Sequence, residues 1–359
     1  MGSCLTARSD AERPVAAAEG LLRWFDTRER DVPWRDERDP YRIWVAEVMA
    51  QQTRMETVGP YYRRFIERFP TPAALASASL DEVLKLWEGL GYYARARHLH
   101  SAAGEIVERH GGRLPESVEE LRALSGIGPY TAGAVASIAF GIAEPAVDGN
   151  ARRVLSRLFD LDDPAAAALA DAARSLLAGA PSRPAAINQA IMDLGGAVCT
   201  PRDPLCPRCP IVASCLARAR RTVALRPARK PRKPTPVRRA ASAILWRGDE
   251  FLLVRRPPTG LLGGLWDLPG TEPVEAPDPP DGRVLGEALS RRFGVQAQAG
   301  PAVATVRHAF SHFRLVLDVL LFEWEGGEPS WEHGSKWASP DLATELALPT
   351  YLRTVLPPR

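Results

Sequence analysis

Residues 124–132 read Leu-Ser-Gly-Ile-Gly-Pro-Tyr-Thr-Ala, and this stretch decides the fold of the first half of the chain. The helix before it is predicted to begin at Ser117, which forms a capping box with the glutamate three residues later. Pro129 suits the first turn of a second helix, and Gly126 and Gly128 permit a tight turn between the two helices. Backbone N–H groups exposed by such a turn at a helix N-terminus form an anion site that suits a DNA phosphate.

An aspartate follows this hairpin in the segment 147–150, Val-Asp-Gly-Asn, eighteen residues after Tyr130. Taken alone, the segment predicts only a turn. Together, the hairpin and the aspartate resemble the helix–hairpin–helix DNA glycosylase superfamily over roughly residues 20–216. The resemblance implies an all-helical catalytic domain whose active site includes Asp148, Asn150 and Tyr130, and whose two hairpin glycines contact DNA.

A second carboxylate lies in residues 41–53, a predicted helix in which Glu47 shares an apolar face with Trp44 and Val48. A glutamate in such a place more commonly packs its stem and keeps its carboxylate in water. Base excision, however, needs two carboxylates in different environments, one to protonate the leaving base and one to stabilise the cationic sugar. The segment resembles the signature of the MutY family of adenine DNA glycosylases, which implies that Glu47 protonates adenine N7 and Asp148 stabilises the oxocarbenium-like sugar. Analogy with retaining glycosidases adds a transient bond to C1′ as a further step.

Position 130 separates two branches of the superfamily. In glycosylases that also cut the strand, such as endonuclease III, a lysine matching Tyr130 attacks C1′ to form a Schiff base. This chain has a tyrosine there, and Lys85 is its only lysine before residue 230. The resemblance therefore implies a monofunctional enzyme with Tyr130 beside the carboxylates; a tyrosine that only caps the helix is the alternative.

Residues 86–97 read Leu-Trp-Glu-Gly-Leu-Gly-Tyr-Tyr-Ala-Arg-Ala-Arg and predict an aromatic wedge beside phosphate ligands. An enzyme that extrudes a base lowers the cost of the gap by inserting a side chain into the stack. Tyr92 matches the inserting position of the family, whereas Tyr93 is expected in the core. The resemblance assigns further residues to the DNA or the base pocket: Gln52, Thr53, Leu90, Trp34 and Arg35. For Trp34, a plain core position is the alternative.

Four cysteines, Cys199, Cys206, Cys209 and Cys215, lie within seventeen residues. This spacing indicates a metal site rather than a disulfide framework, and composition leaves a structural zinc and a [4Fe–4S] cluster equally open. The resemblance implies the [4Fe–4S] cluster. Cys4 needs no role.

A basic, proline-rich stretch covers residues 217–239 and predicts a linker, either a solvated spacer or a cationic strand along phosphates. Residues 240–359 then resemble a Nudix fold, with a hairpin about residues 247–249 and a helix near residues 283–293. Arginines at 291 and 292 occupy the positions of two Mg²⁺-binding glutamates, so the α+β domain is expected to recognise the lesion rather than hydrolyse a pyrophosphate.

Residues 305–312 predict a loop between two strands. Phe310, Ser311 and His312 resemble the motif by which MutY proteins read 8-oxoguanine, and His308 is a neighbour of phosphate or lesion. A serine hydroxyl and adjacent backbone groups supply the donors and acceptors that the added carbonyl and N7–H require. A loop with merely exposed histidines is the alternative.

The whole chain has 359 residues, a net charge of +3 and 45% hydrophobic residues, as expected for about two globular domains. We predict a disordered segment 1–14, a catalytic domain 15–216 with its cluster loop at 199–215, the linker 217–239 and the Nudix-like domain 240–359. The N-terminus has no signal core and the longest apolar run is too short for a bilayer, so a cytoplasmic location without a membrane is expected. We also expect a monomer that is associated with the bacterial nucleoid through DNA.

The expected partner is double-stranded DNA with an A:8-oxoguanine or A:G mispair. Three other functions compete with this one. A glycosylase/lyase for oxidised pyrimidines is disfavoured by the missing lysine and the added domain. A nucleotide pyrophosphohydrolase is disfavoured by the two arginines. A noncatalytic DNA-binding module would tolerate replacement of Glu47 and Asp148.

Overall fold

The computed structural model describes residues 12–28, 33–34, 36–228 and 234–356. The chain forms two compact units, and both are discontinuous in sequence. The first unit comprises residues 1–77 and 101–231, and the second comprises residues 78–100 and 232–359. The expected linear boundary therefore differs from the observed one, because residues 78–100 belong with the C-terminal part of the chain. No helix in the described part of the chain is long and apolar enough to cross a membrane.

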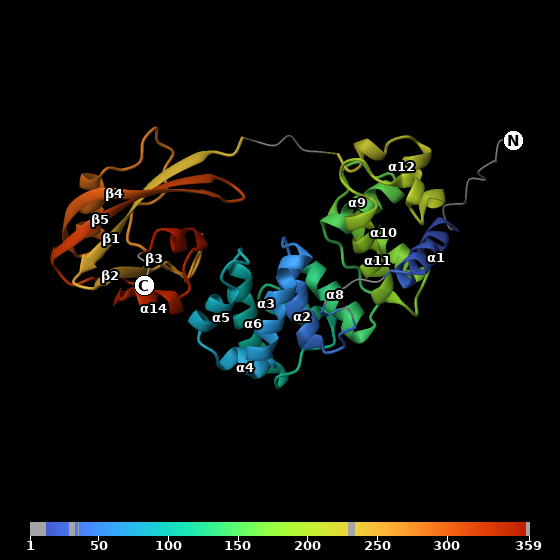
Figure 1. Cartoon of the computed structure of the whole chain (residues 1–359). Helices are drawn as coiled ribbons and strands as arrows, with labels where there is room; N and C mark the ends of the chain where they lie inside the picture. The colour runs from blue at the N-terminus through green and yellow to red at the C-terminus, as the bar shows by residue number, and fades with distance from the viewer. Residues whose placement is uncertain (1–11, 29–32, 35, 229–233, 357–359) are drawn as a thin grey trace. The chain divides into compact units, whose positions relative to one another are not determined.

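The first unit is helical, as predicted (Figure 1). Its first helix packs against three later ones around a core of small and aliphatic side chains, among them Leu21, Leu155, Leu176 and Leu194. Helix α6 (Ala94–His110) contributes to both units. The other helices of the unit are α1 (Glu12–Asp26), α2 (Pro40–Ala50), α3 (Met55–Arg68), α4 (Pro72–Ser77), α7 (Val118–Ala123), α8 (Pro129–Phe140), α9 (Gly149–Leu158), α10 (Ala166–Ala178), α11 (Pro184–Ala197) and the short α12 (Leu216–Ala219).

The predicted hairpin joins α7 to α8. The Ser117 hydroxyl accepts a hydrogen bond from the Glu120 amide, Gly126 has a φ of +74°, and Gly128 precedes Pro129 as the N-cap of α8. These three features confirm the capping box, the turn and the start of the second helix.

A close approach of α8 to a later segment positions the predicted catalytic aspartate. A Cβ at position 133 would lie 2.0 Å from the carbonyl oxygen of Pro145, so only glycine allows this contact. The segment from Pro145 runs against α8 and leads directly to Asp148, which begins α9. Gly133 therefore fixes the approach of Asp148 to the first turn of α8.

The second unit contains a mixed six-stranded sheet with helices on both faces (Figure 1). The central strands β1 and β5 are parallel, the other pairs are antiparallel, and the order is β3-β2-β1-β5-β4 with β6 also paired to β2. Helix α13 covers one face through Leu285, Leu289 and Phe293. The elements are α5 (Leu80–Trp87), β1 (Val237–Arg247), β2 (Glu250–Arg255), β3 (Trp266–Asp267), α13 (Gly282–Phe293), β4 (Gln296–Ala309), β5 (Arg314–Gly326), β6 (Ser335–Ala338), α14 (Pro340–Glu345) and the 3₁₀ helix η4 (Thr350–Thr354).

Helix α5 packs on this sheet domain. Arg97 donates to the Gly263 carbonyl at 2.7 Å, and Arg255 forms an ion pair with Asp81 at 2.6 Å. The Leu84 side chain lies 3.3 Å from the position of a Cβ on Gly264. These contacts explain why residues 78–100 form one compact unit with the C-terminal sheet.

Some expected boundaries differ from the observed ones. Helix α1 begins at Glu12, so residues 12–14 are helical, whereas residues 1–11 lie outside the described residues. Strand β4 runs to Ala309, so the expected loop from 305 is a strand except for its last residues, because the backbone of residues 305–309 pairs with β5.

The expected linker is also folded in its first half. The Asp160 carboxylate accepts hydrogen bonds from the Thr222 hydroxyl at 2.5 Å and from Arg226 at 2.8 Å, and Arg220 adds an ion pair at 3.1 Å. The Ala228 amide donates to the Asp162 carbonyl. Residues 217–228 are therefore tied to the end of α9, and the expectation of an extended spacer was wrong for them.

Candidate active site

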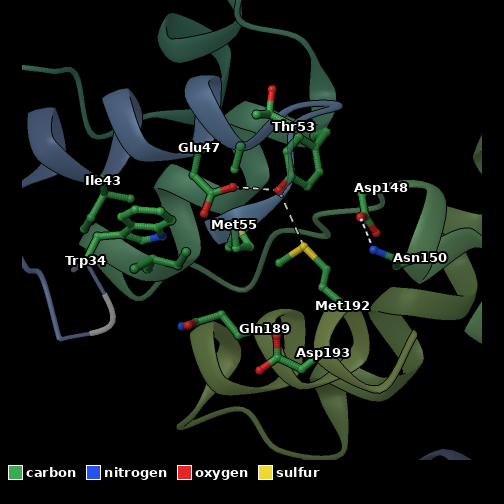
Figure 2. Close-up of a pocket in the computed structure, with 13 residues that line it drawn as sticks. Trp34, Ile43, Glu47, Thr53, Met55, Asp148, Asn150, Gln189, Met192 and Asp193 are labelled. Atoms are coloured by element: carbon green, nitrogen blue, oxygen red, sulfur yellow. Dashed lines mark hydrogen bonds between the residues drawn. The ribbon is translucent and has the colours of Figure 1, made fainter. Parts of the chain in front are cut away.

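A cavity of about 170 Å³ in the first unit brings together the residues predicted to be catalytic (Figure 2). Its walls come from α2, α8, the start of α9 and α11. It is lined by Trp34, Ile43, Glu47, Ala50, Thr53, Met55, Tyr130, Ile138, Asp148, Asn150, Gln189, Met192 and Asp193.

Glu47 projects into this cavity from α2. The helix begins at Pro40 and is capped by Asp39, whose carboxylate accepts from two backbone amides of the first turn. The Tyr130 hydroxyl donates to Glu47 Oε2 at 2.6 Å. Burial raises the pKa of Glu47, the bond from Tyr130 lowers it, and the charge of Asp148 raises it; the net result is a raised pKa. Glu47 thus has an environment in which burial favours the protonated acid over the carboxylate.

Tyr130 stands in the first turn of α8. Burial and the negative charge of Glu47 raise the pKa of its hydroxyl well above the ordinary value, so the group remains a donor. The hydroxyl oxygen also lies 3.5 Å from Met192 Sδ. Tyr130 therefore orients Glu47 rather than acting as a nucleophile.

Asp148 caps the N-terminus of α9. Its Oδ1 accepts from the Ala151 amide at 2.6 Å, and its Oδ2 accepts from Asn150 Nδ2 at 3.2 Å (Figure 2). Asp148 thus accepts from two donors at the positive end of a helix dipole. The cavity thus contains two carboxyl groups in unlike environments, as needed for protonation of a leaving group and stabilisation of a cation.

A chain of hydrogen bonds leads from Asp148 to the cysteines. Asn150 Oδ1 accepts from Arg153 Nη2 at 2.8 Å, and Arg153 Nε donates to the Cys199 carbonyl at 2.6 Å. The same guanidinium donates to the Gly195 carbonyl at 2.6 Å. The rotamer of Asn150, and through it the orientation of the Asp148 carboxylate, depends on the start of the cysteine loop.

Sequence reasoning missed the α11 wall of the cavity. Gln189, Met192 and Asp193 face Glu47 across it in Figure 2, and Asp193 is buried. The sequence does contain a sign of this wall. Gln189 and Asp193 are polar and lie four residues apart, so they share one face of a helix that is otherwise largely apolar.

The four cysteines are all partly buried and electrostatically coupled. Burial, with the charges of the other cysteines, raises the pKa of Cys209 to about 12 and also raises that of Cys215. Among the described residues, no group of three or more His, Cys, Asp or Glu side chains is arranged to hold a single metal ion.

Arg157 is a buried cation at the centre of this loop. Its guanidinium donates to Cys199 Sγ at 3.3 Å and to the carbonyls of Thr200, Val223 and Arg226 at 2.7 to 3.1 Å. Four cysteine sulfurs gathered in one partly buried loop, with a guanidinium donating to one of them, fit Cys₄ ligation.

A larger groove of about 830 Å³ joins the hairpin to the catalytic residues. Gln52, Thr53, Gly126 and Gly128 line it together with Tyr130 and Asp148. Gln52 is exposed with a φ of +56°, a conformation that costs free energy in a residue other than glycine and clusters at functional sites. Trp34 lies partly buried, with its ring 5.1 Å from that of Tyr62, whereas Arg35 lies outside the described residues.

The second unit has its own cavity of about 480 Å³. One wall is the turn 89–94, and the others are residues 260–262, 308–312 and 349–351. Tyr92 is 46% exposed with a φ of +49°, whereas Tyr93 is buried, as predicted. Leu90 is 6% exposed and therefore is not presented to the surface.

The predicted reading motif lies in this cavity. Ser311 and His312 are exposed, and the Phe310 ring packs 4.9 Å from the buried ring of Phe313. His308 lies between Phe310 and Tyr351, at 4.6 and 5.1 Å between ring centres, and burial lowers its pKa. The motif is thus anchored by Phe310 and presents two polar side chains.

Comparisons with known proteins match both units. The HhH-GPD superfamily of base excision DNA repair proteins matches residues 45–178, and the NUDIX domain matches residues 240–357. A human protein named adenine DNA glycosylase is 36% identical over 414 residues, which cover 96% of this chain and 74% of that protein. The protein of that name from Arabidopsis thaliana is 34% identical over 94% of this chain and 63% of its own length.

Two solved structures resemble the helical part of the chain. A thermostable thymine-DNA glycosylase is similar with a TM-score of 0.55 and 28% identity, covering 59% of this chain and 100% of that one. A non-covalent endonuclease III–DNA complex has a TM-score of 0.52 and 23% identity, covering 60% of this chain and 99% of that one, a likeness of fold alone.

Proposed function

This chain belongs to the adenine DNA glycosylase family, and from that membership we propose that it hydrolyses the N-glycosidic bond of adenine mispaired with 8-oxoguanine or guanine. The observation that carries the chemistry is the pair of carboxyl groups in one cavity. Glu47 is buried with a raised pKa, and Asp148 receives two hydrogen bonds at a helix N-terminus.

In this proposal Glu47 is the general acid. It protonates the extruded adenine at N7, so that the base leaves as a neutral group. Tyr130 holds the carboxyl through its hydroxyl at 2.6 Å. Asp148 stabilises the positive charge that develops on the sugar, and water then completes hydrolysis. Tyr130 occupies the place at which a strand-cutting relative has an amine, so no Schiff base forms.

The base opposite adenine is read by the second unit. We assign this reading to Ser311 and His312, because both are exposed beside an anchored phenylalanine in a cavity that Tyr92 also lines. A hydroxyl can both donate and accept, and 8-oxoguanine differs from guanine by one acceptor and one donor. Discrimination worth one or two hydrogen bonds is about 1–3 kcal/mol.

A [4Fe–4S] cluster on Cys199, Cys206, Cys209 and Cys215 completes the proposal. The cluster supplies a rigid, charged brace for the loop when it is bound. Purified protein should contain about four irons per chain and little zinc, as expected for Cys₄ ligation of a cubane cluster. Stoichiometric zinc without iron after anaerobic purification would reverse this assignment.

One experiment tests the main proposal. The protein is incubated with duplexes that carry a single A·8-oxoguanine pair, a single A·G pair or a single thymine glycol, and alkali-labile sites are mapped. We expect cleavage at adenine, fastest opposite 8-oxoguanine. Cleavage confined to the thymine glycol strand would identify a pyrimidine-specific enzyme instead.

We further propose that the protein acts as a monomer on DNA in the cytoplasm. Size-exclusion chromatography with light scattering at several concentrations, with and without duplex, tests the monomer. A concentration-dependent dimer would contradict it.

A further inference from the structure

One ion pair joins the two walls of the cavity in the second unit. Glu88 directly precedes the turn that carries Tyr92, and Arg353 follows Tyr351 by two residues. Arg353 Nε donates to Glu88 Oε1 at 2.7 Å, and Arg353 Nη2 donates to Glu88 Oε2 at 2.9 Å. The geometry is bidentate, the arrangement that gives an arginine–carboxylate pair directional specificity.

The pair is shielded from water and held in place by neighbours. The Glu88 side chain is 13% exposed and that of Arg353 is 26% exposed. Arg353 also donates to the carbonyls of Ala343 and Leu346, and Lys85 adds a bond to Glu88 at 3.0 Å. Burial alone would raise the pKa of Glu88, but the bonds from Arg353 and Lys85 lower it. Glu88 is therefore a charged anchor with fixed partners.

Each residue of the ion pair lies next to a segment of chain that other contacts hold in place. Past Glu88, the carbonyl of Gly91 accepts from Trp87 Nε1 at 3.1 Å and from Arg95 Nη2 at 3.2 Å, which braces the turn below Tyr92. On the other side, the ring of Tyr351 packs against the rings of His308 and Phe310. A displacement of either charged group is therefore passed to a wall of the cavity.

We propose that Glu88 and Arg353 are positioning residues for recognition of the base opposite adenine, and that their ion pair sets the spacing between Tyr92 and the wall carrying Ser311. Neither residue lines the cavity itself. The inference rests on the proposed function, because it assumes that this cavity reads the lesion. A recognition site displaced by roughly 1 Å loses its hydrogen-bond geometry even though all its residues are present.

The test compares single-turnover excision and affinity on A·8-oxoguanine and A·G duplexes for the full-length protein and four variants. Glu88→Gln and Arg353→Gln each remove one charge. The double variant Glu88→Met with Arg353→Met replaces the pair by apolar chains, which often preserves stability. Arg292→Gln is the matched control, since Arg292 also donates to a glutamate (Glu272, 2.9 Å) and to a carbonyl (Gly270, 3.0 Å) but lines no wall of the cavity.

We expect each single variant, and the double variant, to lower the preference for 8-oxoguanine about tenfold, the equivalent of one hydrogen bond. The double variant should lose no more than either single variant, because both residues act through one pair. Arg292→Gln should keep the wild-type preference. An unchanged preference in a folded double variant, or an equal loss in the control, would overturn the inference. A wild-type protein without any preference would instead overturn the proposed function.

Discussion

Replacing Glu47 by Gln should abolish excision while leaving binding of lesion DNA largely intact. The amide has nearly the same size, and its oxygen can still accept the hydroxyl of Tyr130, which lies 2.6 Å from the carboxylate. It cannot deliver a proton. Loss of general acid catalysis costs roughly 100- to 10,000-fold in rate, or about 3–5 kcal/mol in the activation free energy.

The assay is single-turnover excision of adenine from an A·8-oxoguanine duplex with enzyme in excess, alongside a gel-shift measurement of affinity. The affinity of Glu47→Gln for the duplex should stay within roughly twofold of wild type, because the substitution removes less than one hydrogen bond to the DNA. Conservative replacement of another acid outside the cavity, such as Glu19→Gln on α1, is the control. A Glu47→Gln rate within roughly tenfold of wild type would show that another group protonates the base.

Glu47→Gln should also change how the stability of the protein depends on pH. The pKa of Glu47 is raised in the folded protein, so folding favours the protonated acid. Wild type therefore loses stability relative to Glu47→Gln as the pH rises above the ordinary value of about 4.3 and through the raised one. The difference in melting temperature between Glu47→Gln and wild type should grow from pH 4 to pH 8. Parallel curves across this range would mean that Glu47 is not buried as a carboxylic acid.

Three further predictions concern the other site residues. Asp148→Asn should abolish excision yet keep the cap of α9, whereas Asp148→Ala should also cost about 1 kcal/mol of stability; equal melting temperatures for the two variants would contradict the capping role. Wild-type protein should give no borohydride-trapped DNA adduct and Tyr130→Lys could gain weak trapping; efficient trapping by wild type would defeat the monofunctional mechanism. Combined Ser311→Ala and His312→Ala should reduce the preference for A·8-oxoguanine over A·G by about 1–3 kcal/mol in the ratio of excision rates and affinities, with little change on A·G; an unchanged ratio would move discrimination to the helical unit.

Local signals predicted the helical half well, because its elements begin and end at residues with strong backbone preferences. Ser117, Gly126 and Pro129 each determine a cap or a turn without help from distant contacts. The same reasoning failed at 217–228, where proline and arginine suggest an extended chain. Asp160 holds that segment by accepting hydrogen bonds from Thr222 and Arg226, which lie more than sixty residues further along the chain. A local sequence pattern does not predict contacts between residues so far apart.

The candidate site was predicted only in part for a similar reason. Glu47, Tyr130 and Asp148 stand in motifs that resemble a family, so their meeting in one cavity was expected. Gln189 and Asp193 reach the cavity because α11 packs against α8 and α9. This packing depends on tertiary contacts, which the local sequence does not show. Residues 305–309 were expected in a loop because they lie between two strand-like runs. An edge strand such as β4 exposes one face in the same way.

The acceptors of the buried Arg157 guanidinium are synthesised at different times. Its last acceptor, the carbonyl of Arg226, is 69 residues further along the chain. At roughly 5–20 residues per second, Arg157 is synthesised several seconds before that acceptor. Until the Arg226 carbonyl is present, the guanidinium lacks one of the acceptors that satisfy it in the folded protein. All four cysteines are synthesised within this interval, so the set of sulfurs is complete before the set of contacts that surrounds Arg157.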